Sequence, residues 1–144
     1  MKYSVAHDSG RLINPFIVDG QIQGGVAHGV GNALFEWMAY DENAQPLTTT
    51  FGDYLLPTAE DVPKVDMTHL ENPSPLNPLG VKGAGEGGTI PAAAAITAAI
   101  EDALRPFGVK LTETPLAPAR IVELLSEAGA YAKKAAAVKV PAKV

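Results

Sequence analysis

The sequence has no cysteine among its 144 residues, and it has only three histidines. Without cysteine, the chain itself forms neither disulfides nor thiolate-ligated zinc or iron–sulfur sites. His7, His28 and His69 are 21 and 41 residues apart, so none pairs with another ligand at the i, i+4 spacing of a helical metal site. Any redox metal bound here must therefore bring ligands of its own.

Long hydrophobic runs and basic clusters are also missing. The longest apolar run, residues 90–100, is about half as long as a membrane crossing requires, and Glu101 and Asp102 close it. The first ten residues lack the apolar centre of a secretory signal. Sixteen acidic residues face eleven basic ones, with no basic stripe outside the C-terminus. We therefore expect a cytoplasmic protein that binds neither membrane nor nucleic acid.

Short strands and loops are predicted in the first half of the chain. Residues 2–6 and 12–18 resemble two strands in composition, joined by a turn. Residues 39–50 predict two short extended pieces around a second turn. The proline-rich residues 53–80 should run extended over other structure, with one strand over residues 64–70.

Three helices are predicted around these strands. Apolar residues at three- and four-residue intervals indicate a helix over residues 21–38 that buries Trp37 in the core. A second helix is expected over residues 89–104, with Thr89 as its N-cap. A third is expected to begin near Ala117 and to end before a glycine.

These elements predict an α+β fold, with a small mixed or antiparallel sheet and three main helices. The hydrophobic content of 47% suffices for one domain with a single core. We place this domain at residues 1–129 and expect residues 130–144, rich in Lys and Ala, to form a flexible tail.

The first predicted helix is unusually rich in glycine, with Gly24, Gly25, Gly29 and Gly31. Each glycine costs about 1 kcal/mol relative to alanine inside a helix. Two explanations remain open: another element packs closely on the helix, or a ligand lies at its N-terminus, where free N–H groups favour anions.

A second glycine cluster reads GVKGAGEGGT over residues 80–89, in which Gly83, Gly85 and Gly88 satisfy G-x-G-x-x-G. In a dinucleotide-binding turn this pattern follows a buried strand, whereas here prolines interrupt the preceding residues. A nucleotide site is therefore disfavoured. Two roles fit Glu86, which lies between two glycines. Either the dipole of the helix that follows stabilises its carboxylate, or the carboxylate acts as a general base beside a bulky cofactor.

Four stretches identify a relationship. DSGRLINPFIVDGQIQGGVAHGVGNALFE, DYLLPTAEDVP, PSPLNPLGVKGAGEGG and TPLAPARI resemble, in order across residues 4–125, the C-terminal part of the molybdenum-binding large subunit in the xanthine dehydrogenase and aldehyde oxidase family. This resemblance implies a molybdenum–molybdopterin cofactor, often the cytosine dinucleotide form in bacteria, and a fragment of the family's molybdopterin-binding domain. It implies that Glu86 is the catalytic base. The implied cofactor-binding residues are Gln21, Gly24, Gly25, Lys82, Gly83, Ala84 and Gly85.

The resemblance also implies partners. The remainder of the large subunit would supply most of the substrate pocket, and separate iron–sulfur and flavin subunits or domains would carry [2Fe-2S] clusters and FAD. The loop reads GAGEGG, unlike that of true carbon monoxide dehydrogenases, so hydroxylation of an aldehyde or N-heterocycle, with water as the oxygen source, is the expected reaction. The chain alone should be inactive. The alternative is a non-catalytic pterin-binding or subunit-assembly module of the same fold.

Overall fold

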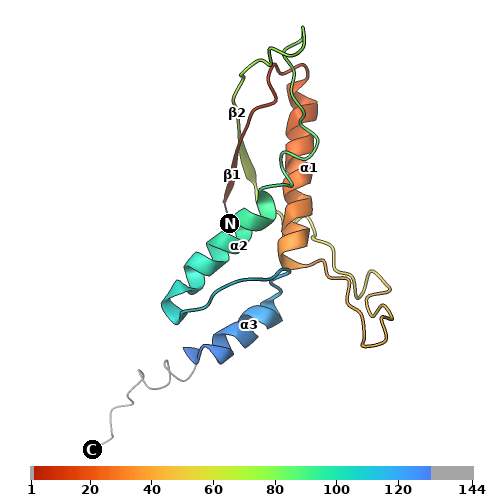
Figure 1. Cartoon of the computed structure of the whole chain (residues 1–144), viewed down its shortest axis with the longest axis vertical. Coiled ribbons are helices and arrows are strands. Elements are labelled where there is room, and N and C mark those ends of the chain that lie inside the picture. The colour runs from red at the N-terminus through yellow and green to blue at the C-terminus, as the bar shows by residue number, and fades with distance from the viewer. Residues whose placement is uncertain (1, 131–144) are drawn as a thin grey trace, which may run out of the picture.

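The structure is a computed structural model that describes residues 2–130. It confirms the α+β fold with three main helices (Figure 1). Residues 131–144, nearly all of the expected tail, lie outside the described residues. In order, the elements are β1 (Tyr3–His7), α1 (Pro15–Leu34), β2 (Val65–His69), α2 (Ala92–Leu104), the short 3-10 helix η1 (Arg105–Phe107) and α3 (Pro118–Glu127).

Helix α1 begins earlier than the sequence pattern predicts. The Asn14 side chain accepts a hydrogen bond from the Ile17 N–H at 3.2 Å, and Pro15 occupies the first turn. Asparagine at the cap and proline just inside the helix are both favoured helix starts. The prediction of a strand over residues 12–18 was therefore wrong, because Asn14-Pro15 starts a helix rather than interrupting a strand.

The sheet is a parallel pair of strands, not the mixed or antiparallel sheet expected. The register runs from Tyr3 opposite Val65 to His7 opposite His69. A hairpin needs a second strand directly after β1, but that segment is the start of α1. Strand β1 therefore pairs with a strand that comes after a helical crossover, which makes the pair parallel.

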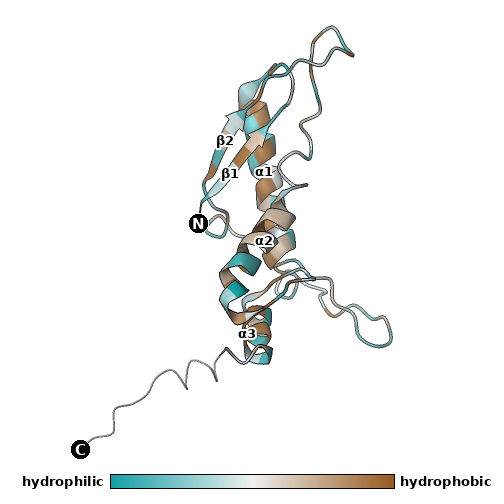
Figure 2. Ribbon diagram, turned by 60° about the vertical axis from the view of Figure 1, so that its left-hand side comes forward, coloured by the Kyte–Doolittle hydropathy of each residue, from teal (hydrophilic) through white to brown (hydrophobic). Residues whose placement is uncertain are grey.

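The core lies where α1 packs on the sheet and on α2. Its buried side chains come from one face of α1 and from both strands and α2: Ile22, Val26, Val30, Ala33, Val5, Val65 and Ile96. Hydrophobic residues recur along α1 in the ribbon coloured by hydropathy (Figure 2). Trp37, which the sequence placed in the core, is 64% exposed. The helix ends at Leu34, so the buried face does not continue to that residue.

Close packing explains two of the helical glycines. A Cβ atom on Gly29 would collide with Ala92 of α2, and one on Gly25 would approach the Thr89 nitrogen at 2.8 Å. Both glycines are buried. Packing, one of the two explanations left open by the sequence, therefore accounts for Gly25 and Gly29.

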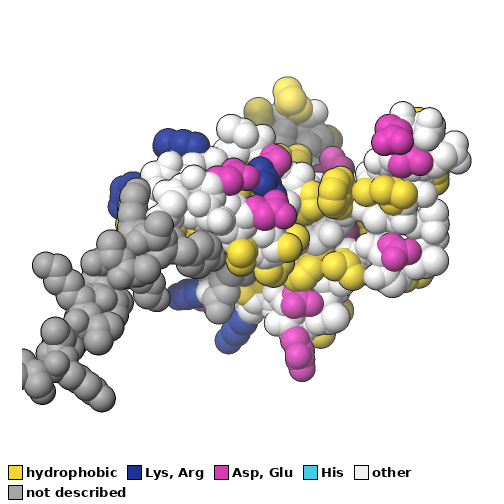
Figure 3. Space-filling view, turned by 90° about the horizontal axis from the view of Figure 1, so that it is seen from below, with side chains coloured by type: hydrophobic (Ala, Val, Ile, Leu, Met, Phe, Trp, Pro, Cys, Tyr) yellow, Lys and Arg dark blue, Asp and Glu magenta, His cyan; other side chains and the backbone are white. Residues whose placement is uncertain are grey.

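The remaining segments surround this core. Residues 36–62 project from the end of α1 (Figure 1), and the isolated bridge between Tyr40 and Pro46 agrees with two short extended pieces. Helix α3 begins beside Ala117 as predicted, and Gly129 beyond its end has a left-handed φ of 67°. The view from below shows hydrophobic side chains gathered in patches among acidic ones (Figure 3). No helix within residues 2–130 is long and apolar enough to cross a membrane.

The glycines of α1 give a matched pair of stability variants. Gly29→Ala should lower the free energy of unfolding by about 1–3 kcal/mol, because the added methyl group overpacks against α2. Gly20→Ala, on the exposed side of the same helix with no described atom near the new methyl group, should raise it by about 0.5–1 kcal/mol. Thermal unfolding measures both. Equal effects would contradict close packing of α1 on α2.

Candidate functional site

The candidate site is formed by residues 82–88, a loop that lies between the end of β1 and the first half of α1. The sequence suggested no strand before this loop, and the structure shows only an isolated bridge between Gly10 and Val81. The strand of a dinucleotide-binding unit is therefore missing among the described residues. The loop is instead held at four places along its length.

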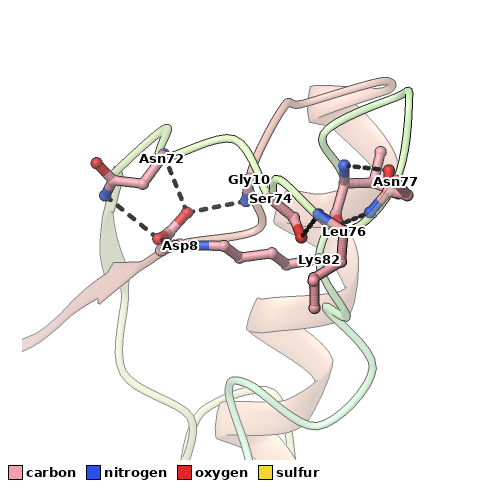
Figure 4. Close-up of polar contacts among 8 residues, drawn as sticks. Asp8, Gly10, Asn72, Ser74, Leu76, Asn77 and Lys82 are labelled. Atoms are coloured by element: carbon pink, nitrogen blue, oxygen red, sulfur yellow. Dashed lines mark hydrogen bonds and ion pairs between the residues drawn. The ribbon is translucent and has the colours of Figure 1, made fainter.

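Asp8 holds the start of the loop (Figure 4). Its carboxylate accepts hydrogen bonds from Lys82 Nζ at 2.6 Å and from the Gly10 N–H at 2.8 Å. It also accepts two from Asn72, both at 3.2 Å. The Lys82 ammonium, followed by the Gly10 N–H, lowers the pKa of Asp8 well below its ordinary value. The ionised form of Asp8 therefore joins three segments.

Backbone contacts next to Asp8 add to this attachment. The Lys82 N–H donates to the Ser9 carbonyl at 2.9 Å, and the Gly80 carbonyl accepts from the N–H groups of Arg11 and Ser74. Gly10 has a φ of 65°, and a Cβ there would collide with the Gly80 carbonyl. The turn after β1 and the proline-rich segment are thus in direct contact, and this contact requires glycine.

Gln21 holds the middle of the loop. Its side-chain Nε2 donates to the Gly85 carbonyl at 2.7 Å. The two residues are 64 positions apart in the sequence, yet the resemblance places both at one site. The structure brings Gln21 and Gly85 together, directly beside Glu86.

Gly87 and Gly88 hold the end of the loop by close packing. A Cβ on Gly88 would collide with the Ile22 carbonyl of α1, and one on Gly87 would collide with the imidazole ring of His7. Each glycine therefore lets the loop backbone lie directly on a neighbouring element, α1 on one side and the end of β1 on the other.

Glu86 is exposed between these fixed points. Its carbonyl accepts hydrogen bonds from the N–H groups of Thr89 and Ile90, both at 3.0 Å, which closes a turn. Its carboxylate has no hydrogen-bond or ion-pair partner among residues 2–130. Helix α2 starts later, with Pro91 at its cap position and no side-chain cap, so neither Glu86 nor Thr89 caps it.

Three other glycines of the two clusters have no explanation within the described residues. Apart from its chain neighbours and its own helix backbone, a Cβ on Gly24, Gly83 or Gly85 would meet no atom of residues 2–130 within 4 Å. None of the three has a left-handed φ. Together with Gln21 and the half-buried Ala84, they leave uncovered backbone beside Glu86.

Sequence reasoning missed several residues that position this loop. Asp8 lies in the turn that the sequence predicts after residues 2–6, and its bond to Gly10 confirms that turn. Its bonds to Asn72 and Lys82 span 64 and 74 residues, and no local pattern predicts them. His7 gave no signal in the sequence. Among residues 2–130, no group of three or more His, Asp or Glu side chains could hold a metal ion.

Comparison with known proteins specifies the class to which this α+β fold and its glycine loop belong. Residues 1–63 match the family of the molybdopterin cofactor-binding domain. The nicotine 6-hydroxylase large subunit of Paenarthrobacter nicotinovorans is 49% identical over 120 residues, which cover 83% of this chain and 15% of that protein. The carbon monoxide dehydrogenase large chain of Hydrogenophaga pseudoflava is 35% identical, over 88% of this chain and 16% of that one.

A solved structure agrees. Quinoline 2-oxidoreductase from Pseudomonas putida 86 superposes with a TM-score of 0.84 at 47% identity, over 86% of this chain and 16% of that one. The chain belongs to the family of molybdopterin-binding large subunits of the molybdenum hydroxylases. It spans about 15% of the length of the curated relatives it matches.

Removal of the Asp8 charge should loosen the loop. Because the native pKa of Asp8 is lowered from 3.8, its stabilising contribution is complete above that pH and is lost as the pH falls through the lowered native value. At neutral pH, Asp8→Asn removes the same charge, and amide hydrogen exchange of residues 72–82 should become faster. Asp66→Asn, which breaks the exposed pair with Lys2, is the matched control and should leave this exchange unchanged. Equal exchange in both variants would show that Asp8 does not hold the loop.

Proposed function

We propose that this chain supplies the catalytic base, Glu86, and one wall of the cofactor site to a molybdenum hydroxylase. One observation carries this proposal: the hydrogen bond from Gln21 to Gly85 fixes the backbone next to Glu86, whose exposed carboxylate has no partner among residues 2–130 and lies beside uncovered glycine backbone. Family membership supports the same reading.

The residues present fit a large flat cofactor. Gly24, Gly83 and Gly85 leave room for a group to lie against the backbone, which is the general reason for glycine where a ligand approaches closely. Gln21, whose Nε2 also donates to the Gly85 carbonyl, would contribute its amide oxygen, and Lys82 and Ala84 would complete the loop that lines the group. When bound, the molybdenum–pterin cofactor, which we expect in its cytosine dinucleotide form if the protein is bacterial, supplies the two-electron redox chemistry.

Besides Gln21, two of the expected contact residues have other partners in the structure. The Lys82 ammonium is paired with Asp8 and the Lys82 N–H donates to Ser9, so the contribution of Lys82 to a cofactor site would come from its backbone carbonyl. Gly25 is buried under the loop against Thr89, and its part in the site would be to let the loop lie close to α1.

Glu86 serves as the base because its carboxylate is accessible and its backbone is fixed. The two N–H groups that donate to its carbonyl, and the glycines on either side, hold the main chain while the side chain remains free to accept a proton. A positioned general base contributes about 10²–10⁴-fold to rate.

We propose an N-heterocycle as the substrate class. The relatives with 49% and 47% identity are named for nicotine and quinoline, both of which contain a nitrogen heterocycle, whereas the carbon monoxide dehydrogenase chain is 35% identical. Aldehydes are the alternative substrate class. The observation that favours the heterocycle is this difference in identity.

The active enzyme requires further protein. The relatives are named as large subunits or large chains, and this chain spans about 15% of their length. We therefore propose that the remainder of a large subunit completes the pocket, and that cytoplasmic iron–sulfur and flavin subunits accept the electrons. The chain alone is expected to be inactive.

Metal and pterin analysis of the protein purified under mild conditions from its native source tests this function. We expect molybdenum, a pterin nucleotide and co-purifying chains or sequence that account for the rest of the large subunit. A purified protein that contains this chain but neither molybdenum nor pterin would contradict the catalytic proposal and would favour an assembly module.

Glu86→Gln in the cofactor-loaded enzyme is the sharpest variant. It should lower kcat by about 10²-fold or more with the metal still bound, because glutamine keeps the shape but cannot accept the proton. Glu60→Gln, a change at an exposed loop glutamate outside the site, should leave kcat unchanged. Full activity of Glu86→Gln, measured by steady-state turnover with confirmed molybdenum content, would exclude its role as the base.

A further inference from the structure

His7 is the residue on which the catalytic side of the loop rests. It is the last residue of β1 and lies opposite His69 of β2, and its carbonyl accepts a hydrogen bond from the Leu70 N–H just beyond β2 at 2.9 Å, so its backbone is fixed. Its half-buried ring lies against Gly87, where any Cβ atom would collide with it. Gly87 directly follows Glu86 in the chain.

The contact of this ring is steric rather than polar. The buried His7 Nε2 atom has no hydrogen-bond partner among residues 2–130. A polar ring in such a place is normally paired, so hydrogen bonding does not explain its position. What the ring provides is a surface on which the Gly87 backbone lies.

From this geometry we infer that His7 is a positioning residue for Glu86. The Gln21 bond fixes Gly85 on one side of Glu86, and the His7 ring limits the movement of Gly87 on the other. The inference rests on the proposed function, since it assigns His7 a role in placing the proposed base. Small displacements of a catalytic group, about 1 Å, can cost about 10²-fold in rate.

The contact between His7 and Gly87 can be tested by a double-mutant cycle in the complete, cofactor-loaded enzyme. His7→Ala removes the support, and Gly87→Ala adds a methyl group that the ring must avoid. Each change should speed hydrogen exchange of the amides of residues 84–88, which is a measurement independent of turnover. In the double variant the methyl group occupies the space that the ring leaves, so the combined effect should be smaller than the product of the two.

Gly20→Ala with His7→Ala is the matched control, because a methyl group on Gly20 meets no described atom and Gly20 is not one of the proposed cofactor contacts. In this control pair, the effects of the two changes on the exchange rates of residues 84–88 should multiply, because the two residues are not in contact. The steady-state constants add a second readout: His7→Ala should lower kcat by about tenfold or more with little change in KM, because it displaces the base without removing substrate contacts. If His7 had a purely structural role, His7→Ala would lower the melting temperature without lowering kcat at unchanged KM.

The positioning role of His7 and the role of Glu86 as the base are tested by separate results. Unchanged exchange of residues 84–88 in His7→Ala, or multiplicative effects in the His7/Gly87 cycle, would overturn the positioning role. Coupling in the exchange cycle supports it. Full turnover by Glu86→Gln would instead overturn the proposed base, and the exchange cycle would still report whether His7 holds the loop.

Discussion

The close approach of α1 to residues 87–92 is the constraint on which the rest of the structure depends. Gly25 and Gly29 on the helix and Gly88 on the loop let two backbones meet where any side chain would intervene. The α1 face that makes this contact also carries Ile22 and Val26 of the core. Because the same face buries the core and receives the loop, the position of the loop is set by the packing of the whole chain.

The candidate site follows from this constraint. A loop rich in glycine would ordinarily be mobile, since glycine gives the backbone the most conformational freedom. Here bonds from Asp8 and Gln21 and contacts with His7 and α1 restrict it along its whole length. The freedom that remains lies in the side chain of Glu86. A fixed backbone with a free carboxylate suits proton transfer, which requires both placement and access.

The parts of the fold that local patterns describe could be predicted from the sequence. The sequence pattern predicted both strands and all three helices of the structure, and it predicted the α+β fold class correctly. The errors came from residues with two meanings: Asn14-Pro15 interrupts a strand or starts a helix, and only the tertiary structure decides. Trp37 has the spacing of a core residue, but it follows the end of α1. The bonds of Asp8 to Asn72 and Lys82 join segments that no sequence window contains.

The two glycine clusters show why composition alone could not separate packing from ligand binding. Gly29 and Gly88 are required because another part of this chain occupies the place of their side chains, whereas Gly83 and Gly85 face space that the described residues leave open. The same residue type thus allows close packing inside the chain at some positions and leaves open space at others. Ile90, four positions after Glu86, is 75% exposed, and Phe16 at the start of α1 is 87% exposed. Uncovered backbone and large apolar side chains near the ends of one loop and one helix are surfaces that a bound group and further protein would cover.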